Sequence, residues 1–396
     1  MTAGIPAIAE LERELDRRRA EGLARTRRVF DSPQGSHVRF EGRELLAFAN
    51  NDYLGLANDP AVVAAARDAA ARFGVGGAAS HLIVGHATPH AALEDALADF
   101  VRPCPSARAL AFSSGYLANL AILTALAGRI DAIFADRLNH ACLTDGARLS
   151  RAAFVRYAHG DVAALDRAID GVVARRRLIV TDAVFSMDGD VAPLPALLDR
   201  AERHDALLVV DDAHGFGVLG DGRGTLAQFG LQSERIVYMG TLGKAAGVAG
   251  AFVAAHPSVI ETLLQTARMY VYTTAAPPLL AAATLAALAS IRDDSARRAH
   301  LGALIERFRA SASGLPWRLL PSSTPIQPLV VGDAREAVHV ADALLARGIL
   351  VPAIRPPTVP AGSARLRISL SAAHSHVDVA ALTSALHAVA TGSARA

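Results

Sequence analysis

Lys244 ends the segment Gly240-Thr241-Leu242-Gly243-Lys244, which directly follows an apolar run. Two other groups that could do chemistry, Asp211 and His214, follow another apolar run in the same way. A lysine amine can act as a covalent nucleophile, a carboxylate can hold a nitrogen atom protonated, and an imidazole can donate or accept a hydrogen bond. These three side chains could act together, provided that the fold brings them to one place.

Five short apolar segments alternate with longer helical patterns in the middle of the chain. They are Ala109–Phe112, Ala132–Ala135, Leu178–Thr181, Leu207–Val210 and Ile236–Met239. This rhythm is typical of βαβ units and predicts a mostly parallel, buried sheet. Ligands of such sheets bind at the carboxyl ends of the strands. We therefore expect the polar residues that follow these segments to converge on one edge of the sheet.

A phosphate site is predicted beside the three groups. The segment Ser113-Ser114-Gly115-Tyr116-Leu117-Ala118-Asn119 follows the first of the five strands and opens a helix. Free N–H groups and the helix dipole favour a phosphate at such a position. A lysine, a carboxylate and a histidine beside a phosphate site are what pyridoxal phosphate requires, because the lysine forms a Schiff base and the carboxylate pairs with the pyridinium nitrogen.

Two nucleotide-binding loops are alternatives at these strand ends. The segment from Gly240 to Lys244 is not a Walker A loop, because its glycines are too close together and Ala245 stands where Ser or Thr would bind magnesium. Gly215-x-Gly217-x-x-Gly220 matches the dinucleotide pattern. However, four residues intervene after the strand, and the residues that follow resemble a loop rather than a helix. The dinucleotide interpretation is therefore the weaker one.

A metal site is not expected. His86 and His90 have the spacing of two metal ligands on one helix face, but Pro89 precedes the second histidine and no Glu lies between them. The two cysteines, Cys104 and Cys142, form no Cys-x-x-Cys pair.

Composition limits the classes of protein. The chain has 396 residues, of which 52% are hydrophobic and 20% charged, with a formal net charge of +2. These values predict a globular enzyme and argue against disorder and nucleic-acid binding. Two cysteines and the absence of a secretory signal favour a cytoplasmic location. The longest apolar stretch, Leu279–Ile291, is too short to cross a membrane.

After Pro277–Pro278 the pattern changes to that of a second, smaller α+β domain. A helix over Leu279–Ser290, a strand over Ile326–Val331, a helix around Ala334–Ala346 and a strand over Arg365–Leu370 are predicted there. At the other end of the chain, Ile8–Leu23 predicts an amphipathic helix.

Six motifs carry a family resemblance. They are Asn51-Asp52-Tyr53-Leu54-Gly55-Leu56, Ser114-Gly115-Tyr116-x-Ala118-Asn119, Asn139-His140-Ala141, Val184-Phe185-Ser186-Met187-Asp188-Gly189-Asp190, Asp211-x-Ala213-His214-Gly215 and Thr241-x-Gly243-Lys244. Through them nearly the whole chain resembles the α-oxoamine synthase family of fold-type I pyridoxal-phosphate enzymes. The segment Ile354–Gly362, followed by Arg365-Leu366-Arg367, is most similar to the biotin-pathway members.

The resemblance implies a fold and an assembly. The expected fold class is α/β: a fold-type I pyridoxal-phosphate-dependent transferase with a mostly parallel central sheet in the large domain and a smaller α+β C-terminal domain. The expected division is an N-terminal helix and arm over 1–45, a large cofactor-binding domain over 46–280 and a small domain over 281–396. A homodimer is implied, and Tyr272-Thr273-Thr274 resembles a segment that reaches the neighbouring subunit's site.

The resemblance also implies the roles of residues around the cofactor. Lys244 would carry the cofactor and later move the substrate α-proton, which calls for a lysine pKa lowered to about 7–8. Asp211 would pair with the pyridinium nitrogen, His214 would hydrogen-bond the phenolic oxygen, and His140 would stack on the ring. Further cofactor contacts are implied for Gly115, Tyr116, Thr241 and Ser186, the first three at the phosphate.

The substrate residues follow from the same resemblance. Asn51 and Arg367 would hold the amino acid carboxylate, with Arg365 left open as an alternative to Arg367. Arg25 and Thr358 match positions that are tied to the acyl substrate. The stretch from Gly74 to His81 departs from the family pattern, because alanines stand where relatives often carry serine and glycine.

The implied activity is that of an acyltransferase, a decarboxylative condensation of L-alanine with pimeloyl-CoA or a pimeloyl-carrier protein in biotin synthesis. The choice between the two acyl carriers stays open. The rivals are a glycine-using relative and a non-catalytic pyridoxal-binding or dinucleotide-binding protein. No nucleic-acid or membrane partner is expected.

Overall fold

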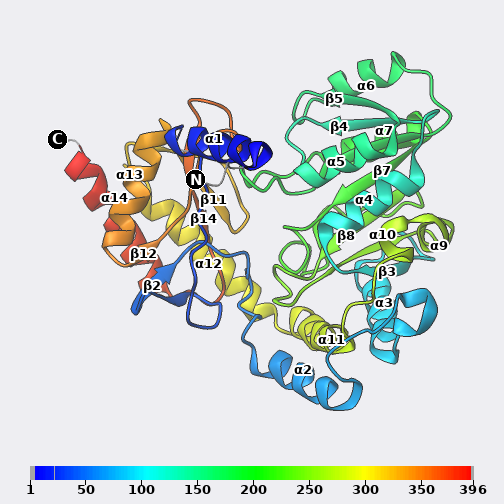
Figure 1. Cartoon of the computed structure of the whole chain (residues 1–396), viewed down its shortest axis with the longest axis horizontal. Coiled ribbons are helices and arrows are strands. Elements are labelled where there is room, and N and C mark those ends of the chain that lie inside the picture. Colours follow the sequence, from blue (N-terminus) through cyan, green and yellow to red (C-terminus); the bar gives the residue numbers. More distant parts are fainter. Residues whose placement is uncertain (1–4, 22, 394–396) are drawn as a thin grey trace.

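The computed structural model describes residues 5–21 and 23–393 of the chain (Figure 1). It contains a large α/β domain built on a seven-stranded sheet and a smaller α+β domain built on a four-stranded sheet. This is the fold class predicted from the sequence. In the described part of the chain, no helix is long and apolar enough to span a membrane.

The large sheet has the strand order β3-β9-β8-β7-β6-β4-β5. Its strands are Arg108–Phe112 (β3), Ala132–Asp136 (β4), Ala153–Tyr157 (β5), Arg177–Asp182 (β6), Ala206–Asp211 (β7), Ile236–Thr241 (β8) and Ala251–Ala255 (β9). Strands β4 to β8 run parallel, whereas β9 is antiparallel to β3 and β8. The five predicted strands are confirmed, and their carboxyl ends meet at one edge of the sheet.

Helices cover both faces of this sheet, which explains why its strands are apolar along their whole length. One face packs against α4, α5, α9 and α10, and the other against α3, α6, α7 and α11. The helices of this domain are Pro60–Phe73 (α2), Thr88–Val101 (α3), Gly115–Leu126 (α4), Ala141–Ser150 (α5), Val162–Asp170 (α6), Leu194–Arg203 (α7), Thr225–Gln228 (α8), Pro257–Thr266 (α9), Arg268–Val271 (α10) and Pro278–Asp293 (α11), with a π-helical turn at His81–Gly85 (η1).

The smaller domain contains an antiparallel sheet in the order β10-β11-β14-β13. Its elements are Ser295–Ser311 (α12), Arg318–Leu319 (β10), Ile326–Gly332 (β11), Ala334–Ala346 (α13), Ala353–Ile354 (β13), Ala364–Ser369 (β14) and His376–Ser393 (α14). The predicted strands at Ile326–Val331 and Arg365–Leu370 and the predicted helix at Ala334–Ala346 are thereby confirmed. Strand β14 is buried along its whole length, which fixes the two arginines it carries.

The beginning of the chain joins the smaller domain. Strands His37–Phe40 (β1) and Arg43–Ala47 (β2) form a hairpin, and β2 pairs in parallel with Ile349–Leu350 (β12). Figure 1 shows this N-terminal part, in blue, beside the orange and red C-terminal elements. The predicted amphipathic helix is Pro6–Ala20 (α1). The division at 45 and 280 remains a prediction.

Candidate active site

A cavity of about 210 Å³ lies where β6, β7 and β8 end and α4 begins. It is lined by Gly115, Tyr116, Asn119, His140, Cys142, Asp182, Ser186, Asp211, Ala213, His214, Met239, Thr241 and Lys244. All the residues that the sequence analysis assigns to cofactor binding are in this lining. The roles of the individual residues stay predictions, but the fold brings their side chains to one place.

Lys244 lies in the turn after β8, and its Nζ is 2.8 Å from Nε2 of His214. It is the only lysine in the sequence. Burial lowers the pKa of Lys244 to about 8, against the opposing effect of the Asp211 carboxylate. Burial, reinforced by the charges of Lys244 and Arg367, lowers the pKa of His214 well below its usual range. A neutral imidazole therefore faces an amine that is partly neutral near pH 7 to 8, as a covalent nucleophile requires.

Asp211 ends β7 and directs its carboxylate into the cavity. Its Oδ2 accepts a hydrogen bond from Asn119 Nδ2 at 2.6 Å, and its Oδ1 accepts one from the Ala213 amide at 3.0 Å. A carboxylate offers about four lone-pair directions, so Asp211 can still accept a proton donor from the cavity.

His140 is the N-cap of α5, where its ring nitrogen Nδ1 accepts from the Cys142 amide at 3.3 Å. The His140 amide donates to Asp182 Oδ2 at 2.8 Å. Burial, together with the charge of Asp211, raises the pKa of Asp182 well above its usual range. Burial also raises the pKa of the Cys142 thiol to about 12. Cys142 is therefore a packing residue rather than a nucleophile.

The first turn of α4 faces the cavity with Gly115 and Tyr116. The cap is Ser114, whose Oγ accepts from the Leu117 amide at 3.3 Å. Amides in the first turn of a helix have no intrahelical acceptor and carry the positive end of the dipole. Thr241, at the end of β8, brings a hydroxyl to the same region. The site therefore offers an anion such as a phosphate a place beside Lys244 and Asp211.

Asn51 and Arg367 meet beside the cavity. Both terminal nitrogens of Arg367 donate to Asn51 Oδ1 at 3.2 Å, and its Nε donates to the Ser186 carbonyl at 2.6 Å. Arg365 is directed elsewhere, since it pairs with Asp188 and donates to the Met187 carbonyl at 3.2 Å. This arrangement favours Arg367 over Arg365 as the group that holds a substrate carboxylate.

The two residues predicted for the acyl substrate do not line the cavity. Arg25 is exposed in the segment after α1, and it makes no hydrogen bond or ion pair with any of the residues that the structure describes. Thr358 is exposed in the loop between β13 and β14, where its amide donates to the Arg355 carbonyl at 3.1 Å. Within one chain, the structure does not join these two positions to Lys244.

Two residues of the site were given no role by the sequence analysis. Asn119 orients Asp211, as described above, and Tyr53 lies between His214 and Asn51, with its hydroxyl 2.6 Å from His214 Nδ1. Both occur in motifs quoted above. An uncharged residue within a motif gives no sign of which side chain it will contact, because that depends on the packing of distant segments.

A histidine cluster lies outside the cavity. His81, His86 and His90 have ring nitrogens within 4.8 Å of one another. However, His90 accepts from the Ala87 amide through Nδ1 at 3.0 Å, and its Nε2 lies 2.8 Å from the Ala276 carbonyl. With both ring nitrogens of His90 engaged, the cluster does not present three free imidazole ligands, and the expectation of no metal site stays a prediction.

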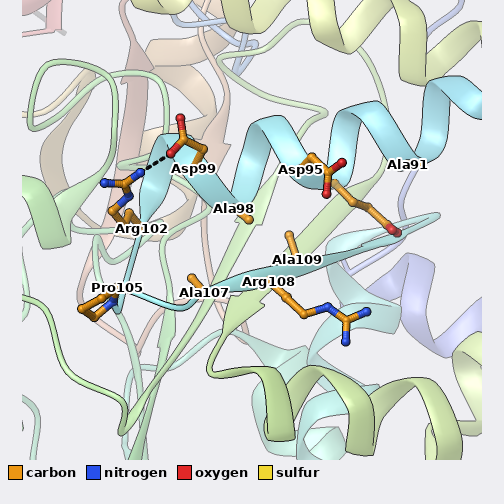
Figure 2. A pocket seen from close by; sticks show the side chains of 10 residues that line it. Ala91, Asp95, Ala98, Asp99, Arg102, Pro105, Ala107, Arg108 and Ala109 are labelled. Carbon is orange, nitrogen blue, oxygen red and sulfur yellow. Dashed lines mark hydrogen bonds and ion pairs between the residues drawn. The ribbon is translucent and has the colours of Figure 1, made fainter.

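A pocket of about 370 Å³ lies between α3 and β3, the edge strand of the large sheet (Figure 2). Its polar residues include Asp95, Asp99, Arg102 and Arg108, and the figure shows Asp99 and Arg102 as an ion pair. The pocket holds no lysine or histidine. The cavity at Lys244 is therefore the better candidate for chemistry.

Comparison with known proteins defines the family. The model of the class I and II aminotransferases matches residues 43–386. The 8-amino-7-oxononanoate synthase of Methylobacillus flagellatus is 57% identical over 386 residues, which cover 97% of each chain. The enzyme of the same name from Nitrosomonas europaea is also 57% identical, over 97% of this chain and 99% of its own.

The chain belongs to the 8-amino-7-oxononanoate synthase family.

Solved structures agree with this family assignment. A serine palmitoyltransferase from S. paucimobilis has a TM-score of 0.90 at 28% identity, with 97% of each chain covered. An 8-amino-7-oxononanoate synthase from Francisella tularensis has a TM-score of 0.73 at 31% identity, over 87% of this chain and 98% of its own. The α-oxoamine synthase resemblance and the expectation of pyridoxal phosphate as the cofactor are thereby confirmed.

The donor set of the cavity fits this cofactor. Lys244 supplies an amine of lowered pKa, Asp211 a carboxylate with free lone pairs, and the first turn of α4 an anion site. No other lysine exists in the chain to carry the cofactor. The Gly215-x-Gly217-x-x-Gly220 alternative is not supported, because these glycines lie in a turn and α8 begins only at Thr225.

Proposed function

We propose that the chain condenses L-alanine with a pimeloyl thioester, in biotin synthesis, and releases 8-amino-7-oxononanoate, carbon dioxide and the free thiol carrier. The observation that carries this proposal is the arrangement of one cavity. The sole lysine, Lys244, faces Asp211 there, and the Asn51–Arg367 pair lies beside it. The identity of 57% to enzymes named for this product supports it.

Each side chain has a definite task in this reaction. Bound pyridoxal phosphate supplies the electron sink that allows a bond at the substrate α-carbon to break. Asp211 would accept a hydrogen bond from the ring nitrogen of the cofactor and so keep that nitrogen protonated. The Nζ of Lys244 takes the α-proton, for which its pKa of about 8 is well matched to neutral pH.

Arg367 and Asn51 decide which bond reacts, because they fix the carboxylate and thereby the rotation of the α-carbon. The guanidinium offers a planar pair of N–H donors that matches a carboxylate. Arg367 is itself held by Ser186 and Ser369, through Nε at 2.6 Å and NH1 at 2.9 Å. A clamp fixed in this way loses little freedom when the substrate binds.

The proposal includes a homodimer. Support comes from apolar residues that are exposed in the single chain: Leu82, Ile83 and Val84 on η1 are 44%, 74% and 79% exposed. Adjacent exposed apolar residues often mark a protein–protein interface. The η1 segment is joined to the Tyr272–Thr274 segment by the Ser80–Thr274 bridge. A second subunit that covers this surface would complete the acyl-substrate site, to which we assign Arg25 and Thr358.

A panel of amino acids and acyl thioesters tests the proposal. We expect L-alanine with pimeloyl thioester to give the highest kcat/KM, with a modest preference over glycine because one methyl group is worth about 1–3 kcal/mol. Arg25→Ala should weaken pimeloyl thioester use far more than alanine binding. If glycine with acetyl or succinyl thioester reacts faster, the substrate assignment is wrong, whereas the cofactor site is unaffected.

A further inference from the structure

A continuous line of hydrogen bonds leads from Lys244 to the Asn51–Arg367 pair, which is the proposed clamp for the substrate carboxylate. Lys244 Nζ is 2.8 Å from His214 Nε2, and His214 Nδ1 is 2.6 Å from the Tyr53 hydroxyl. That hydroxyl is 3.1 Å from Asn51 Oδ1, which also accepts from Arg367 at 3.2 Å. Two parts of the site that act at different atoms of the substrate are thus connected through Tyr53.

The donors and acceptors in this line allow one consistent arrangement of protons. Arg367 has only donors, so the Asn51 atom that faces it is the oxygen, which can only accept. Tyr53 must then donate its single proton to Asn51. The Tyr53 oxygen in turn accepts from Nδ1–H of His214, which leaves Nε2 of His214 without a proton. That nitrogen therefore accepts from Lys244.

Tyr53 suits this task because of its surroundings. Its side chain is fully buried and lies outside the cavity lining, so its hydroxyl is not exposed to solvent. Burial raises the pKa of Tyr53 above its usual range, although the charge of Arg367 opposes the change. The phenol therefore keeps its proton, which it donates to Asn51 Oδ1.

We propose that Tyr53 is a positioning residue that fixes the proton of His214 on Nδ1 and couples this tautomer to the Asn51–Arg367 clamp. The inference rests on the proposed function, because the clamp and Lys244 belong to the same site. When an amino acid carboxylate takes the N–H donors of Arg367, Asn51 Oδ1 loses those partners. It then attracts the Tyr53 proton more strongly. This reinforces the His214 tautomer that has its proton on Nδ1 and an unprotonated Nε2 facing Lys244.

The tautomer is measured on the cofactor-free protein, so this experiment does not depend on any activity. Nitrogen-15 NMR of histidine-labelled protein reports which ring nitrogen carries the proton, and His214→Gln identifies the signals. We expect Nδ1–H in the original protein and a substantial Nε2–H population in Tyr53→Phe. Tyr238→Phe is the matched control, since it removes a buried hydroxyl that donates to Asp212 at 3.0 Å on the other side of the sheet. Its His214 signals should be unchanged.

Two results would overturn the proposal: His214 protonated on Nε2 in the original protein, or signals that Tyr53→Phe does not alter. If Tyr53→Phe does not fold, Asn51→Leu removes the acceptor from the other end of the line. It should shift His214 in the same direction, and unchanged signals in that variant would equally contradict the assignment.

The coupling is measured as L-alanine affinity, read from the absorbance change of the cofactor-loaded protein. We expect Tyr53→Phe and Asn51→Ala each to weaken binding about tenfold, because a buried hydrogen-bonding group loses its partner. The double variant should be little worse than either single variant, since the residues act in one network. If the loss of affinity in the double variant equals the product of the two single losses, the coupling is refuted. If the original protein does not respond to alanine at all, the proposed function fails, whereas the tautomer measurement still decides the role of Tyr53.

Discussion

Asp211 and Asp212 are consecutive residues whose carboxylates lie on opposite sides of the large sheet. Asp211 faces the cavity and Asn119, whereas Asp212 accepts from the Thr225 amide at 2.6 Å and from the Tyr238 hydroxyl at 3.0 Å. Successive side chains of a strand point to opposite faces, and this alternation extends one residue beyond β7. Asp211 can therefore contact a ligand, whereas Asp212 organises the loop that leads to Thr225.

Exchange of either acid for asparagine should separate these two tasks. Asp211→Asn should fold and lose activity by at least about a hundredfold, because a neutral amide cannot keep the ring nitrogen protonated. Asp212→Asn should keep the cofactor chemistry but lower the thermal midpoint, since an amide keeps only one of the two oxygens that accept from Thr225 and Tyr238. Steady-state kinetics and thermal unfolding of both variants give the answer. Near-normal turnover of Asp211→Asn would move the pairing role to another acid, such as Asp182.

Covalent attachment of the cofactor should depend on pH in a way that reports the pKa of Lys244. Only the neutral amine attacks, and its pKa of about 8 predicts that the rate of cofactor uptake by cofactor-free protein rises about fivefold from pH 7 to 8 and levels off above pH 9. A lysine of ordinary pKa would show a rate that still rises steeply at pH 9. Uptake followed by absorbance distinguishes the two cases.

Borohydride reduction supplies the control for this experiment. The reduced cofactor should be found by mass spectrometry on the peptide that contains Lys244, the sole lysine. Lys244→Ala should take up no reducible cofactor. Label that remains in this variant would show that another amine is the nucleophile.

The two arginines of β14 should differ in their effect on substrate binding. Arg367→Lys should weaken L-alanine binding about tenfold to a hundredfold, because a lysine cannot present the two parallel N–H donors of a guanidinium. Arg365→Lys changes a residue that pairs with Asp188 and should alter alanine affinity by less than about threefold. The comparison uses the dissociation constant of alanine for each loaded variant. A larger effect of Arg365→Lys would reverse the assignment.

His159 should stabilise the fold in a pH-dependent manner. Its Nδ1 is 3.0 Å from Asp136 and its Nε2 is 2.9 Å from Asp190, and these two carboxylates raise its pKa to about 10. Because the folded pKa lies above the unfolded value of 6.5, this stabilisation is fully present below pH 6.5 and is lost as pH rises towards 10.

The measurement is the free energy of unfolding of His159→Gln relative to the original protein. We expect a loss of about 1–3 kcal/mol at pH 6 that shrinks steadily up to pH 10. His204→Gln is the control, since among the described residues His204 contacts one carboxylate, that of Asp166 at 3.2 Å. A loss that does not vary with pH would show that His159 acts by packing against Phe185 alone.

The exposed apolar turn η1 should be the interface of a homodimer. Ile83→Asp would place a charge in that interface and should convert the dimer to a monomer, or weaken it by several orders of magnitude at micromolar concentration. Val173→Asp alters an exposed valine that lies elsewhere in the chain, just before β6, and should leave the mass unchanged. Sedimentation equilibrium measures both. A dimer that persists in Ile83→Asp would place the interface elsewhere.

The sequence predicts the strand ends well, because burial on both faces leaves an apolar run followed by polar residues. It does not predict β9, since Ala251-Phe-Val-Ala-Ala is rich in alanine, which favours helices. Nor does it predict β5, an edge strand that is only partly buried. In each case the neighbouring strands, rather than the local residues, decide the structure.

In the candidate site, too, the local sequence predicts some residues, whereas long-range packing decides the contacts of others. Lys244, Asp211 and His214 follow strands that run parallel. Because the carboxyl ends of parallel strands meet at one edge of the sheet, the sequence predicts that these residues lie close together. The contacts of Tyr53 and Asn119 depend on segments about 90 to 160 residues away, and no local pattern specifies such contacts. The relation of Arg25 and Thr358 to the site would depend on a second chain under the proposed dimer, which sequence reasoning on one chain does not place.

The clamp at Arg367 also sets the time at which the site can first exist. Arg367 follows its partner Asn51 by 316 residues, and the Ser369 and Ala372 amides bond back to the carbonyls of Phe48 and Tyr53. At a synthesis rate of about 5–20 residues per second, Asn51 waits roughly 15–60 s for Arg367. The Lys244–Asp211 half of the site lies on strands already made by then, so a nascent chain could gain affinity for its cofactor well before it can hold an amino acid.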